Sequence, residues 1–528
     1  MKIKLFFILI TSLLISCNTI KHQNSKLNQL IPTKKLKRDV DFAYNKLQKL
    51  QPALYWYISK EHLDFKFDSL KTTITKPLTS YEFYTKITPV INEVRQGHLS
   101  VAPNTKRWSK KESKEIAKKG IGPFSQFEFM ILDEKLYVQK NKSIDTSIAI
   151  GSEIISINSV STASILKKYN KLITSDGYNT TFFKHYLPKI FSTYYVYENG
   201  VKDSLLYQFK FNDSLKSVWI KRKKDQIATK IKIDSTTNKT SKMEKKKLNL
   251  AQKKLKKRNN INGYDEGTKS VQRTLHFIEK DSSIAVLKIK SFNIGDYETF
   301  YKETFQHIKN AKSKVLILDL RNNPGGRLNE INNLYSFVAD SAIAFADKSE
   351  VASKTSLLKR DYFTGNLGTK VLKTIVYPFY LGALYLIIEK QGSRYYFSGS
   401  ESRIQKLQEN RFKGKMYVLI NGGSFSASSI LSSNLKGSKR AIFVGEETGG
   451  AFNGTVAGQM PIVTLPYSKV KMRIGLMKIV PHYKTEEQGR GIRPDVEIIP
   501  TIEDKIKGND PEIEWILQNI KQESDDEK

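Results

Sequence analysis

The stretch VLILDLRNNPGG, residues 315–326, decides the fold, because it joins an apolar strand pattern to a turn rich in glycine. Every position over 315–320 except Asp319 is apolar, which is typical of a strand in a parallel sheet covered on both faces. Gly325 and Gly326 end the stretch, and glycine lets backbone N–H groups approach a ligand closely. The stretch therefore predicts a buried strand and a turn that is either a ligand-binding loop or an ordinary strand-to-helix connection.

The apolar runs on either side of this stretch extend an α/β pattern. Further strands are predicted over 284–289, 417–420 and 441–444, and helices over 297–310 and 328–337. Because helices alternate with apolar strands, the strands are expected to pair in parallel. We therefore predict an α/β core over 281–505 within an α+β multidomain chain, followed by a polar C-terminal tail over 506–528.

The segment over 37–120 predicts a small N-terminal helical domain. Apolar residues over 40–50 and 81–94 recur at spacings near three and four, as on one face of a helix. Thr79 stands where a helix cap would. Gly97 ends the helical pattern before a short strand.

The period of the pattern changes over 121–180, where strands are expected. FEFMIL at 127–132 reads as one strand. The stretch GSEIISIN at 151–158 resembles the G-D-x-I-x-x-I-N-G segment of PDZ domains, although Ser152 and Ser159 depart from it. A PDZ domain binds an extended peptide as an added strand at a sheet edge. We expect a PDZ-like β domain over 121–180; an unrelated hairpin and a PDZ-like fold that no longer binds peptide are the alternatives.

A connector is predicted over 181–280, with a basic insertion at 221–258. The insertion holds sixteen Lys and Arg against three acids, which is +13 of the chain's net charge of +36. Few apolar residues predict a solvated segment that is partly helical at most. It lacks the interleaved aromatics of nucleic-acid-binding arms, so anionic lipid headgroups are the expected contact and nucleic acid is not. The apolar stretch over 371–388 contains Pro378 and predicts a hairpin at the cleft or at a membrane surface.

The N-terminus reads as a targeting segment, because a short basic start precedes an apolar stretch that is too short to span a membrane. LISC at 14–17 resembles a bacterial lipobox. We expect a lipoprotein signal peptide over 1–16, lipidation of Cys17, which is the only cysteine, and a tether over 17–36; the alternative is a plain signal peptide with an incidental cysteine. Asn18 after the cysteine favours the outer membrane, facing the periplasm, within the cell envelope.

A small-residue turn follows the predicted strand over 417–420. It reads NGGSFSASSI, residues 421–430, and is expected to open a helix. A tight turn of this kind lets one hydroxyl project, while free N–H groups of a helix start point at whatever reacts. This is the geometry of a nucleophile elbow, although the motif is not that of the α/β-hydrolases. Gly/Ser loops are common, so the turn alone is a weak signal.

Five motifs together resemble peptidase family S41, the C-terminal-processing or tail-specific serine peptidases, whose core tricorn protease shares. The motifs occur in the family's order and spacing: IKSF at 289–292, LDLRNNPGG at 318–326, NGGSFSAS at 421–428, VGEETGG at 444–450 and GRGIRPDVEI at 489–498. The resemblance implies a crotonase-like, ClpP-like catalytic core. It covers roughly 280–500 and, less closely, 35–180.

The resemblance also implies roles for individual residues. Ser426 would be the nucleophile, and the oxyanion hole would be formed by the N–H of Ala427 and that of Gly325 or Gly326. Such donors are typically worth about 3–4 kcal/mol each in acyl transfer. No metal or organic cofactor is implied.

The base and its acid partner depend on the branch of the family. Ala451 stands where the processing branch has its lysine, so a Ser–Lys dyad is absent. The tricorn-like branch uses a histidine from the N-terminal part, and RQGHL at 95–99 is similar to its phrase. We therefore predict His98 as the base, with His482 as the alternative. The acid position reads Gln488, with Glu487 one residue away, so either residue is a candidate partner.

Two functions follow from this resemblance. The first is a serine endopeptidase that cuts unfolded or C-terminal segments of envelope polypeptides through an acyl-enzyme on Ser426. The second is a non-catalytic protein of the same fold that binds peptides or hydrophobic ligands, for which the aromatic stretch over 371–388 would be suited. Nucleic-acid binding rests on charge alone and conflicts with secretion.

Overall fold

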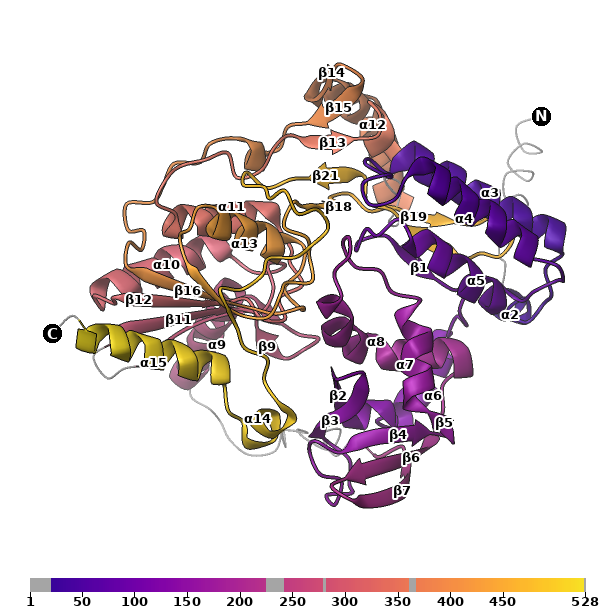
Figure 1. The fold of residues 1–528 in the computed structure, drawn as a ribbon, viewed down its shortest axis with the longest axis horizontal. Helices are drawn as coiled ribbons and strands as arrows, with labels where there is room; N and C mark the ends of the chain where they lie inside the picture. The colour runs from indigo at the N-terminus through magenta and orange to yellow at the C-terminus, as the bar shows by residue number, and fades with distance from the viewer. Residues whose placement is uncertain (1–19, 225–241, 279–281, 360–366, 527–528) are drawn as a thin grey trace.

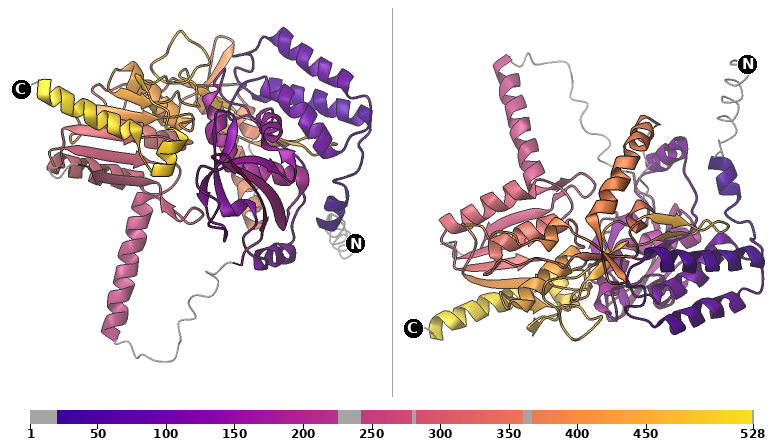
Figure 2. Two further views of the ribbon diagram at one scale, coloured as in Figure 1. Left: turned by 60° about the horizontal axis from the view of Figure 1, so that its bottom comes forward. Right: turned by 90° about the horizontal axis from the view of Figure 1, so that it is seen from above.

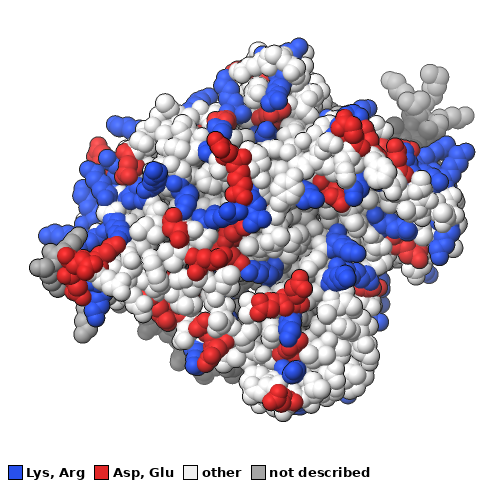
Figure 3. Space-filling view, viewed as in Figure 1, with Lys and Arg blue, Asp and Glu red and all other residues white. Residues whose placement is uncertain are grey.

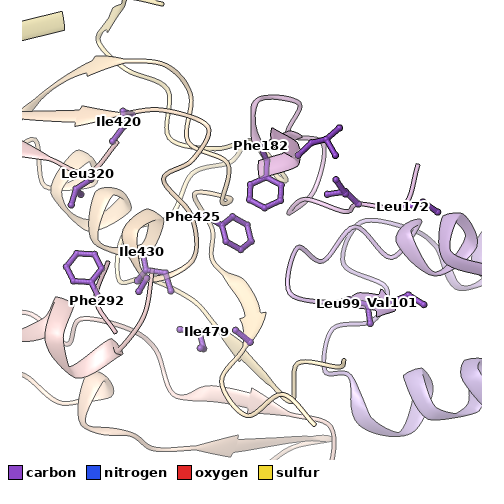
Figure 4. Close-up of a cluster of buried hydrophobic side chains, with 14 of the residues drawn as sticks. Leu99, Val101, Leu172, Phe182, Phe292, Leu320, Ile420, Phe425, Ile430 and Ile479 are labelled. Carbon is purple, nitrogen blue, oxygen red and sulfur yellow. The ribbon is translucent and has the colours of Figure 1, made fainter. Parts of the chain in front are cut away.

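The computed structural model describes residues 20–224, 242–278, 282–359 and 367–526. They form a mixed α/β multidomain protein with three parts, a helical domain, a β domain and an α/β core (Figure 1). One continuous hydrophobic cluster runs through all three parts. Figure 4 shows their junction, where Leu99 and Val101 of the helical domain, Phe182 of the β domain, and Phe425 and Ile430 of the core are drawn.

The helical domain confirms the periodicity seen in the sequence. Its helices are α2 (Ile20–Ser25), α3 (Thr33–Leu50), α4 (Lys60–Thr73), α5 (Ser80–Asn92) and α6 (Lys110–Lys118). Thr79 caps α5 as expected, in a reciprocal capping box with Glu82. The predicted tether over 17–36 already contains α2 and the start of α3, where Leu36 is fully buried. The signal peptide and Cys17 lie outside the described residues.

The β domain extends beyond its predicted end at residue 180. Its sheet has the order β2-β3-β4-β6-β7, and β5 pairs with β4. These strands and their helices are β2 (Phe127–Leu132), β3 (Lys135–Asn141), β4 (Glu153–Ile157), β5 (Val160–Ser161), α7 (Thr162–Asn170), α8 (Thr181–Asn199), β6 (Ser204–Phe211) and β7 (Ser214–Lys221), preceded by the short helix η1 (Phe124–Gln126). Because β6 pairs with β4, the first part of the predicted connector over 181–280 belongs to this domain.

The core contains the predicted parallel sheet. Its order is β10-β11-β12-β16-β17-β22, antiparallel between β10 and β11 and parallel from β11 onward. The strands are β10 (Arg273–Phe277), β11 (Ile284–Ile289), β12 (Val315–Asp319), β16 (Lys415–Ile420), β17 (Ile442–Gly445) and β22 (Val496–Glu497), and the small hairpin β8 (Tyr264–Asp265) and β9 (Ser270–Val271) precedes them. The helices on one face are α10 (Tyr297–Asn310), α11 (Leu328–Val338) and α13 (Ala427–Gly437).

The opposite face of this sheet is covered by the C-terminal segment. The predicted polar tail over 506–528 is instead helical, in α14 (Ile502–Lys507) and α15 (Pro511–Asp526). Ile516 of α15 is fully buried against Val286, Ile317 and Leu419. The prediction of a polar tail is therefore wrong, because one apolar stripe of α15 covers the second face of the sheet.

Two small sheets complete the fold, and the first of them joins the helical domain to the core through β1. The first has the order β1-β20-β19 and the second β14-β15-β13-β21-β18. Their strands are β1 (Ser100–Ala102), β13 (Ser349–Val351), β14 (Ile388–Gln391), β15 (Arg394–Phe397), β18 (Thr455–Ala457), β19 (Ile462–Thr464), β20 (Lys471–Arg473) and β21 (Met477–Ile479). In the first sheet Val101 pairs with Met472. Asp39 adds to this attachment by accepting the backbone N–H groups of Tyr467 and Ser468.

Two segments were given a predicted form of their own. The basic insertion is partly helical, in α9 (Lys242–Asn262), while residues 225–241 of it lie outside the described part. The stretch over 371–388 is not a hairpin but the helix α12 (Leu367–Ile387), which tolerates Pro378. Short 3₁₀ turns, η3 (Ser356–Lys359) and η4 (Ser400–Ser402), lie on either side of α12. Within the described ranges no helix is long and apolar enough to cross a bilayer.

Candidate active site

Ser426 lies on a strained turn between the strand β16 and the helix α13. Its backbone has φ 58° and ψ −123°, a region that non-glycine residues rarely adopt. Such strain costs on the order of 1–3 kcal/mol and persists only where the surroundings enforce it. Within 422–435, Ser426 is the one residue that is not buried. The turn therefore holds the Ser426 hydroxyl outward from an otherwise closed segment.

The two glycine-rich loops predicted from the sequence enforce this turn together. Ser424 Oγ donates to the carbonyl of Leu320 at 2.8 Å, and the N–H of Phe425 donates to the carbonyl of Asn323 at 2.9 Å. Gly325 has φ +94°, and a Cβ there would lie 2.7 Å from both the nitrogen of Ala427 and the Cβ of Ser426. Only glycine fits at that position without moving the nucleophile.

His98 reaches Ser426 from the helical domain. Its Nε2 lies 2.9 Å from Ser426 Oγ, within hydrogen-bond distance. The ring is buried and stacks on Phe425, with ring centroids 4.9 Å apart. Gly97 permits this approach, because a Cβ there would lie 2.5 Å from the Phe425 ring. The strand β1, which begins two residues after His98, is held by its pairing with β20.

The other nitrogen of His98 begins a chain of polar groups that ends on Asp176. Nδ1 lies 3.0 Å from Thr455 Oγ1, and Thr455 Oγ1 donates to Asp176 Oδ1 at 3.1 Å. The N–H of Gly97 donates to the same carboxylate oxygen at 2.8 Å. An ionised carboxylate only accepts hydrogen bonds, so the one proton of the Thr455 hydroxyl is directed to Asp176. Thr455 then accepts Nδ1–H, and Nε2 of His98 is left unprotonated toward Ser426.

Burial sets the charges of this chain. Asp176 is 1% exposed, and burial raises its pKa to about 6, against the opposing effect of its hydrogen bonds from Gly97 and Thr455. Burial, and then the positive charge of Arg473, lowers the pKa of His98 to about 3. At neutral pH His98 is therefore neutral and able to accept a proton, while Asp176 is ionised.

The predicted acid partners lie elsewhere. Glu487 is exposed and forms an ion pair with Arg493 at 2.8 Å, and Gln488 accepts the indole N–H of Trp56 at 3.3 Å. Neither is placed beside His98. The next residue, Gly489, packs behind Gly177, and its carbonyl accepts the N–H of Tyr178 at 2.7 Å.

This packing explains why neither Glu487 nor Gln488 lies beside His98. The segment around Gly489 supports the turn that carries Asp176 instead of supplying the acid itself. The partner of His98 is therefore Asp176, acting through Thr455, and not Glu487 or Gln488.

The alternative bases are also separated from the nucleophile. His482 is exposed, its ring packs edge-on against Tyr483, and its backbone N–H donates to Phe345. Ala451 is buried and pairs with Gly491. A methyl group therefore occupies the position of the lysine in the Ser–Lys dyad. His98 is the base candidate that the structure brings to Ser426.

Of the three backbone N–H groups predicted for the oxyanion hole, two remain as candidate donors. Ala427 is the first residue of α13, where backbone N–H groups have no partner within the helix and the helix dipole favours negative charge. The N–H of Gly325 already donates to Asn323 Oδ1 at 2.9 Å. Gly326 bridges to Phe292 through its neighbours, namely Phe292 N–H to the Gly325 carbonyl and Arg327 N–H to the Phe292 carbonyl. Its own N–H therefore faces away from that bridge, which makes Gly326 the candidate for the second donor, after Ala427.

Sequence reasoning missed Thr455 and Asp176. Asp176 stands in TSDGYN, residues 174–179, where an Asp-Gly pair indicates only a turn. Thr455 follows a glycine in a short strand and carries no motif of its own. Both residues become visible only through folding, because 279 residues of sequence separate them.

A cavity of about 480 Å³ lies between the β domain and the core, next to the site rather than at it. Its walls include the edge strand β2, the start of α8 and the ends of core strands, with residues such as Met130, Lys184, His185, Asn322 and Asn421. Among the described residues no group of three or more His, Cys, Asp or Glu side chains is arranged to hold a metal ion. The chemistry available at Ser426 is acyl transfer.

A serine on a strained turn, a buried histidine beside its hydroxyl and backbone N–H groups at a helix start are the groups that serine-type hydrolases use. The family model described as Peptidase family S41 matches residues 283–498, which lie within the core.

Two further comparisons give one curated relative and one similar fold. A carboxy-terminal-processing protease of Bartonella bacilliformis is 27% identical over 235 residues, which are 44% of this chain and 42% of that protein. The chain therefore matches less than half the length of this curated relative. The fold is similar to that of mature CPAF, with a TM-score of 0.54 and 13% identity over 90% of this chain and 94% of that one. Mature CPAF complexed with lactacystin gives the same TM-score, at 14% identity over 90% and 95% of the two chains.

Proposed function

We propose that this protein is a serine endopeptidase that hydrolyses peptide bonds in unfolded or C-terminal segments of envelope polypeptides. One observation carries the proposal, the 2.9 Å contact between His98 Nε2 and Ser426 Oγ at the start of α13. A serine hydroxyl is a weak nucleophile and needs a base within hydrogen-bond distance. A histidine with only a structural role would not need this contact.

The chemistry follows from the positions of the side chains. His98 Nε2 takes the proton of Ser426 Oγ as the oxygen attacks the substrate carbonyl carbon. The N–H groups of Ala427 and Gly326 stabilise the resulting oxyanion, and the loss of one such donor costs about 3–4 kcal/mol. The imidazolium then returns its proton to the leaving amine. A water molecule, activated in the same way, hydrolyses the ester on Ser426 and releases the acyl product.

Thr455 and Asp176 have positioning roles in this proposal. Thr455 relays the orientation that Asp176 imposes, so that the lone pair of His98 faces Ser426. The carboxylate of Asp176 also stabilises the imidazolium that forms in the transition state, although the Thr455 hydroxyl lies between the two groups. Direct contact between carboxylate and imidazole would be stronger, so we expect the contribution of Asp176 to be smaller than in a triad with a direct contact.

The substrate class rests on the β domain. We propose that this domain is PDZ-like and that the core is crotonase-like in its detailed topology. The strand β2 ends its sheet, and residues Phe129 to Leu132 line the cavity between the domain and the core. An extended polypeptide can add to the free edge of such a strand, which suits unfolded segments and chain ends.

The place of action is proposed to be the cell envelope, at the outer membrane facing the periplasm. The lipobox-like LISC at 14–17 supports acylation of Cys17 after removal of residues 1–16. Metabolic labelling with an alkynyl fatty acid should mark the wild-type protein. Equal labelling of Cys17→Ser would contradict the anchor without affecting the proposed chemistry.

The peptidase proposal is tested with the full chain and an unfolded substrate. Reduced, denatured casein should be cut by the wild type and left intact by Ser426→Ala, with products read by mass spectrometry. If both proteins bind the substrate equally and neither cuts it, the alternative holds, namely a non-catalytic binding protein of the same fold.

A further inference from the structure

The helix α12 exposes apolar side chains where a surface helix would expose polar ones. Its inner face packs on the protein through Leu384, which is 5% exposed, and through Ile388 just beyond its end. Its outer face carries Phe379, which is 78% exposed, and Leu386, which is 86% exposed. Eight large apolar residues of this segment are each at least 41% exposed, Val371, Leu372, Ile375, Val376, Phe379, Tyr385, Leu386 and Ile387.

The spacing of these residues makes a continuous stripe. Leu372, Ile375, Phe379 and Leu386 are separated by three, four and seven residues, so they lie along one side of the helix. Soluble monomers rarely expose contiguous apolar surface of this extent, and such patches mark sites of contact with proteins or membranes. By contrast, α3 buries its apolar stripe of Leu36, Val40, Leu47 and Leu50.

The basic helix α9 projects on the same side as α12. The right view of Figure 2 shows both helices pointing in one direction, with the first described helix, α2, also lying toward that side. Among the side chains of α9 that the structure describes, Arg258 alone forms an ion pair, with Glu303. Exposed cations without an acidic partner precede it on the same helix, Lys253, Lys254, Lys256 and Lys257. The face drawn in Figure 3, in contrast, mixes acidic and basic side chains.

We propose that α12 and α9 dock this protein on an anionic lipid bilayer, with the outer stripe of α12 inserted among the acyl chains and the lysines of α9 at the headgroups. The described helices do not cross a membrane, so α12 lies at the interface. Apolar insertion and cationic attraction are the two signals that stable membrane attachment needs. The like charges of α9 disfavour a second copy of the chain as the partner. The inference does not depend on lipidation of Cys17 or on peptidase activity.

A local probe tests insertion. Cys17 is the only cysteine, so the full chain carrying Cys17→Ser and Phe379→Cys can be labelled at one position with the environment-sensitive dye NBD. Its emission should rise severalfold and shift to the blue when vesicles of phosphatidylethanolamine and phosphatidylglycerol are added. The matched control, Cys17→Ser with Phe65→Cys, labels a phenylalanine that is 65% exposed on α4, and its emission should not change.

A charge reversal tests the role of α9. Lys253→Glu, Lys256→Glu and Lys257→Glu together should weaken co-sedimentation with the same vesicles by roughly tenfold or more, since each cation near an anionic surface contributes about 1 kcal/mol. Binding to phosphatidylcholine vesicles should change little. The matched control reverses three exposed cations of α3, Lys34→Glu, Arg38→Glu and Lys49→Glu, on a helix that lies away from this side in Figure 2. That variant should bind as the unreversed chain does.

Three results would overturn the proposal. The first is emission at position 379 that is unchanged by vesicles even though the protein sediments with them, because the N-terminal segment alone would then bind. The second is emission at position 379 that rises with protein concentration in the absence of vesicles, because a second copy would then cover α12. The third is equal loss of sedimentation in the α9 and α3 reversals, because net charge and not this face would then govern binding.

Discussion

The nucleophile and the base of the proposed site are built in opposite ways. Ser426 is positioned by its own turn and by the adjoining glycine loop, all within the core. The base depends on three distant segments: Gly97 and Asp176 are 79 residues apart, and Thr455 follows 279 residues after Asp176. The strain at Ser426 is thus a property of one domain, whereas an oriented His98 exists only when the helical and β domains are attached to the core.

This difference has a functional consequence. A separated core would keep a strained serine and its backbone donors but would lose its base. The strand pairing of β1 with β20 is then part of the catalytic machinery, since it fixes His98 relative to the core. Substitutions in the two halves should therefore behave differently, and they can be ordered by the size of the expected effect.

The largest effect is expected where the two halves meet. Ser426→Ala and His98→Ala should each lower kcat by about 10⁴–10⁶-fold, and the double variant should be no worse than either, because members of one catalytic unit are not additive. Steady-state hydrolysis of a casein-derived peptide measures this. His482→Ala is the matched control and should remain near wild type. Additive losses in the double variant would show that Ser426 and His98 do not act as one catalytic unit.

A smaller loss is expected from removing the buried charge. Asp176→Asn keeps an oxygen that can accept from Thr455, so kcat should fall by about 10–100-fold and not by the larger factor of a wrong tautomer. In the wild type the rate should rise as pH increases through about 6, where Asp176 ionises. This rise should be missing from the pH profile of Asp176→Asn. An unchanged profile would remove Asp176 from the account.

The same substitution should stabilise the fold. The carboxyl pKa is about 6 in the folded protein against an ordinary 3.8, so the folded state binds more protons between these values and the free energy of unfolding falls as pH rises through them. At pH 7 the ionised group costs about 3 kcal/mol, which Asp176→Asn should return as a higher melting temperature. Below about pH 4 the two proteins should melt alike. A less stable variant at pH 7 would contradict the burial argument.

The relay itself should matter somewhat less. Thr455→Val removes the hydroxyl between His98 and Asp176, and a loss of about tenfold in kcat with little change in KM is expected, within the range of one positioning hydrogen bond. Thr455→Ser should restore most of the rate, because it restores the hydroxyl. Equal losses in both variants would indicate packing and not hydrogen bonding.

The smallest effect is expected for Glu487, one of the two candidate acids predicted from the sequence. Glu487→Gln should leave kcat within about twofold, because an exposed ion pair such as Glu487–Arg493 contributes at most about 1 kcal/mol. A pH-rate profile of this variant, compared with that of Asp176→Asn, separates the two candidate acids. A lost acid limb in Glu487→Gln would restore the original prediction.

The sequence indicated the local half of the site and only part of the other. The strand over 315–320 and the turn over 421–430 are readable because strand period and glycine positions are local signals. His98 was found through its phrase and not through physics, since one histidine in an apolar context is usually structural. Asp176 has no such phrase. Its role arises from burial beside Thr455, which depends on how the β domain packs.

The same distinction explains the errors in the fold. The helix α15 was read as a polar tail, because its single apolar stripe is short and its purpose, closing one sheet face, is set by the core. The stretch over 371–388 was read as a hairpin because of Pro378, yet a helix accommodates it in α12. Tertiary context overrode local propensity in both segments.

The central claim is that a histidine from the helical domain activates a serine of the core. The second-order rate constant for labelling by a fluorophosphonate tests it most directly, because this reagent reports activation of the serine without a peptide substrate. Wild type and His482→Ala should label at the same rate. His98→Ala should label about 10²–10⁴-fold more slowly, and Ser426→Ala should not label at all. Labelling of His98→Ala at the wild-type rate would show that His98 does not activate Ser426.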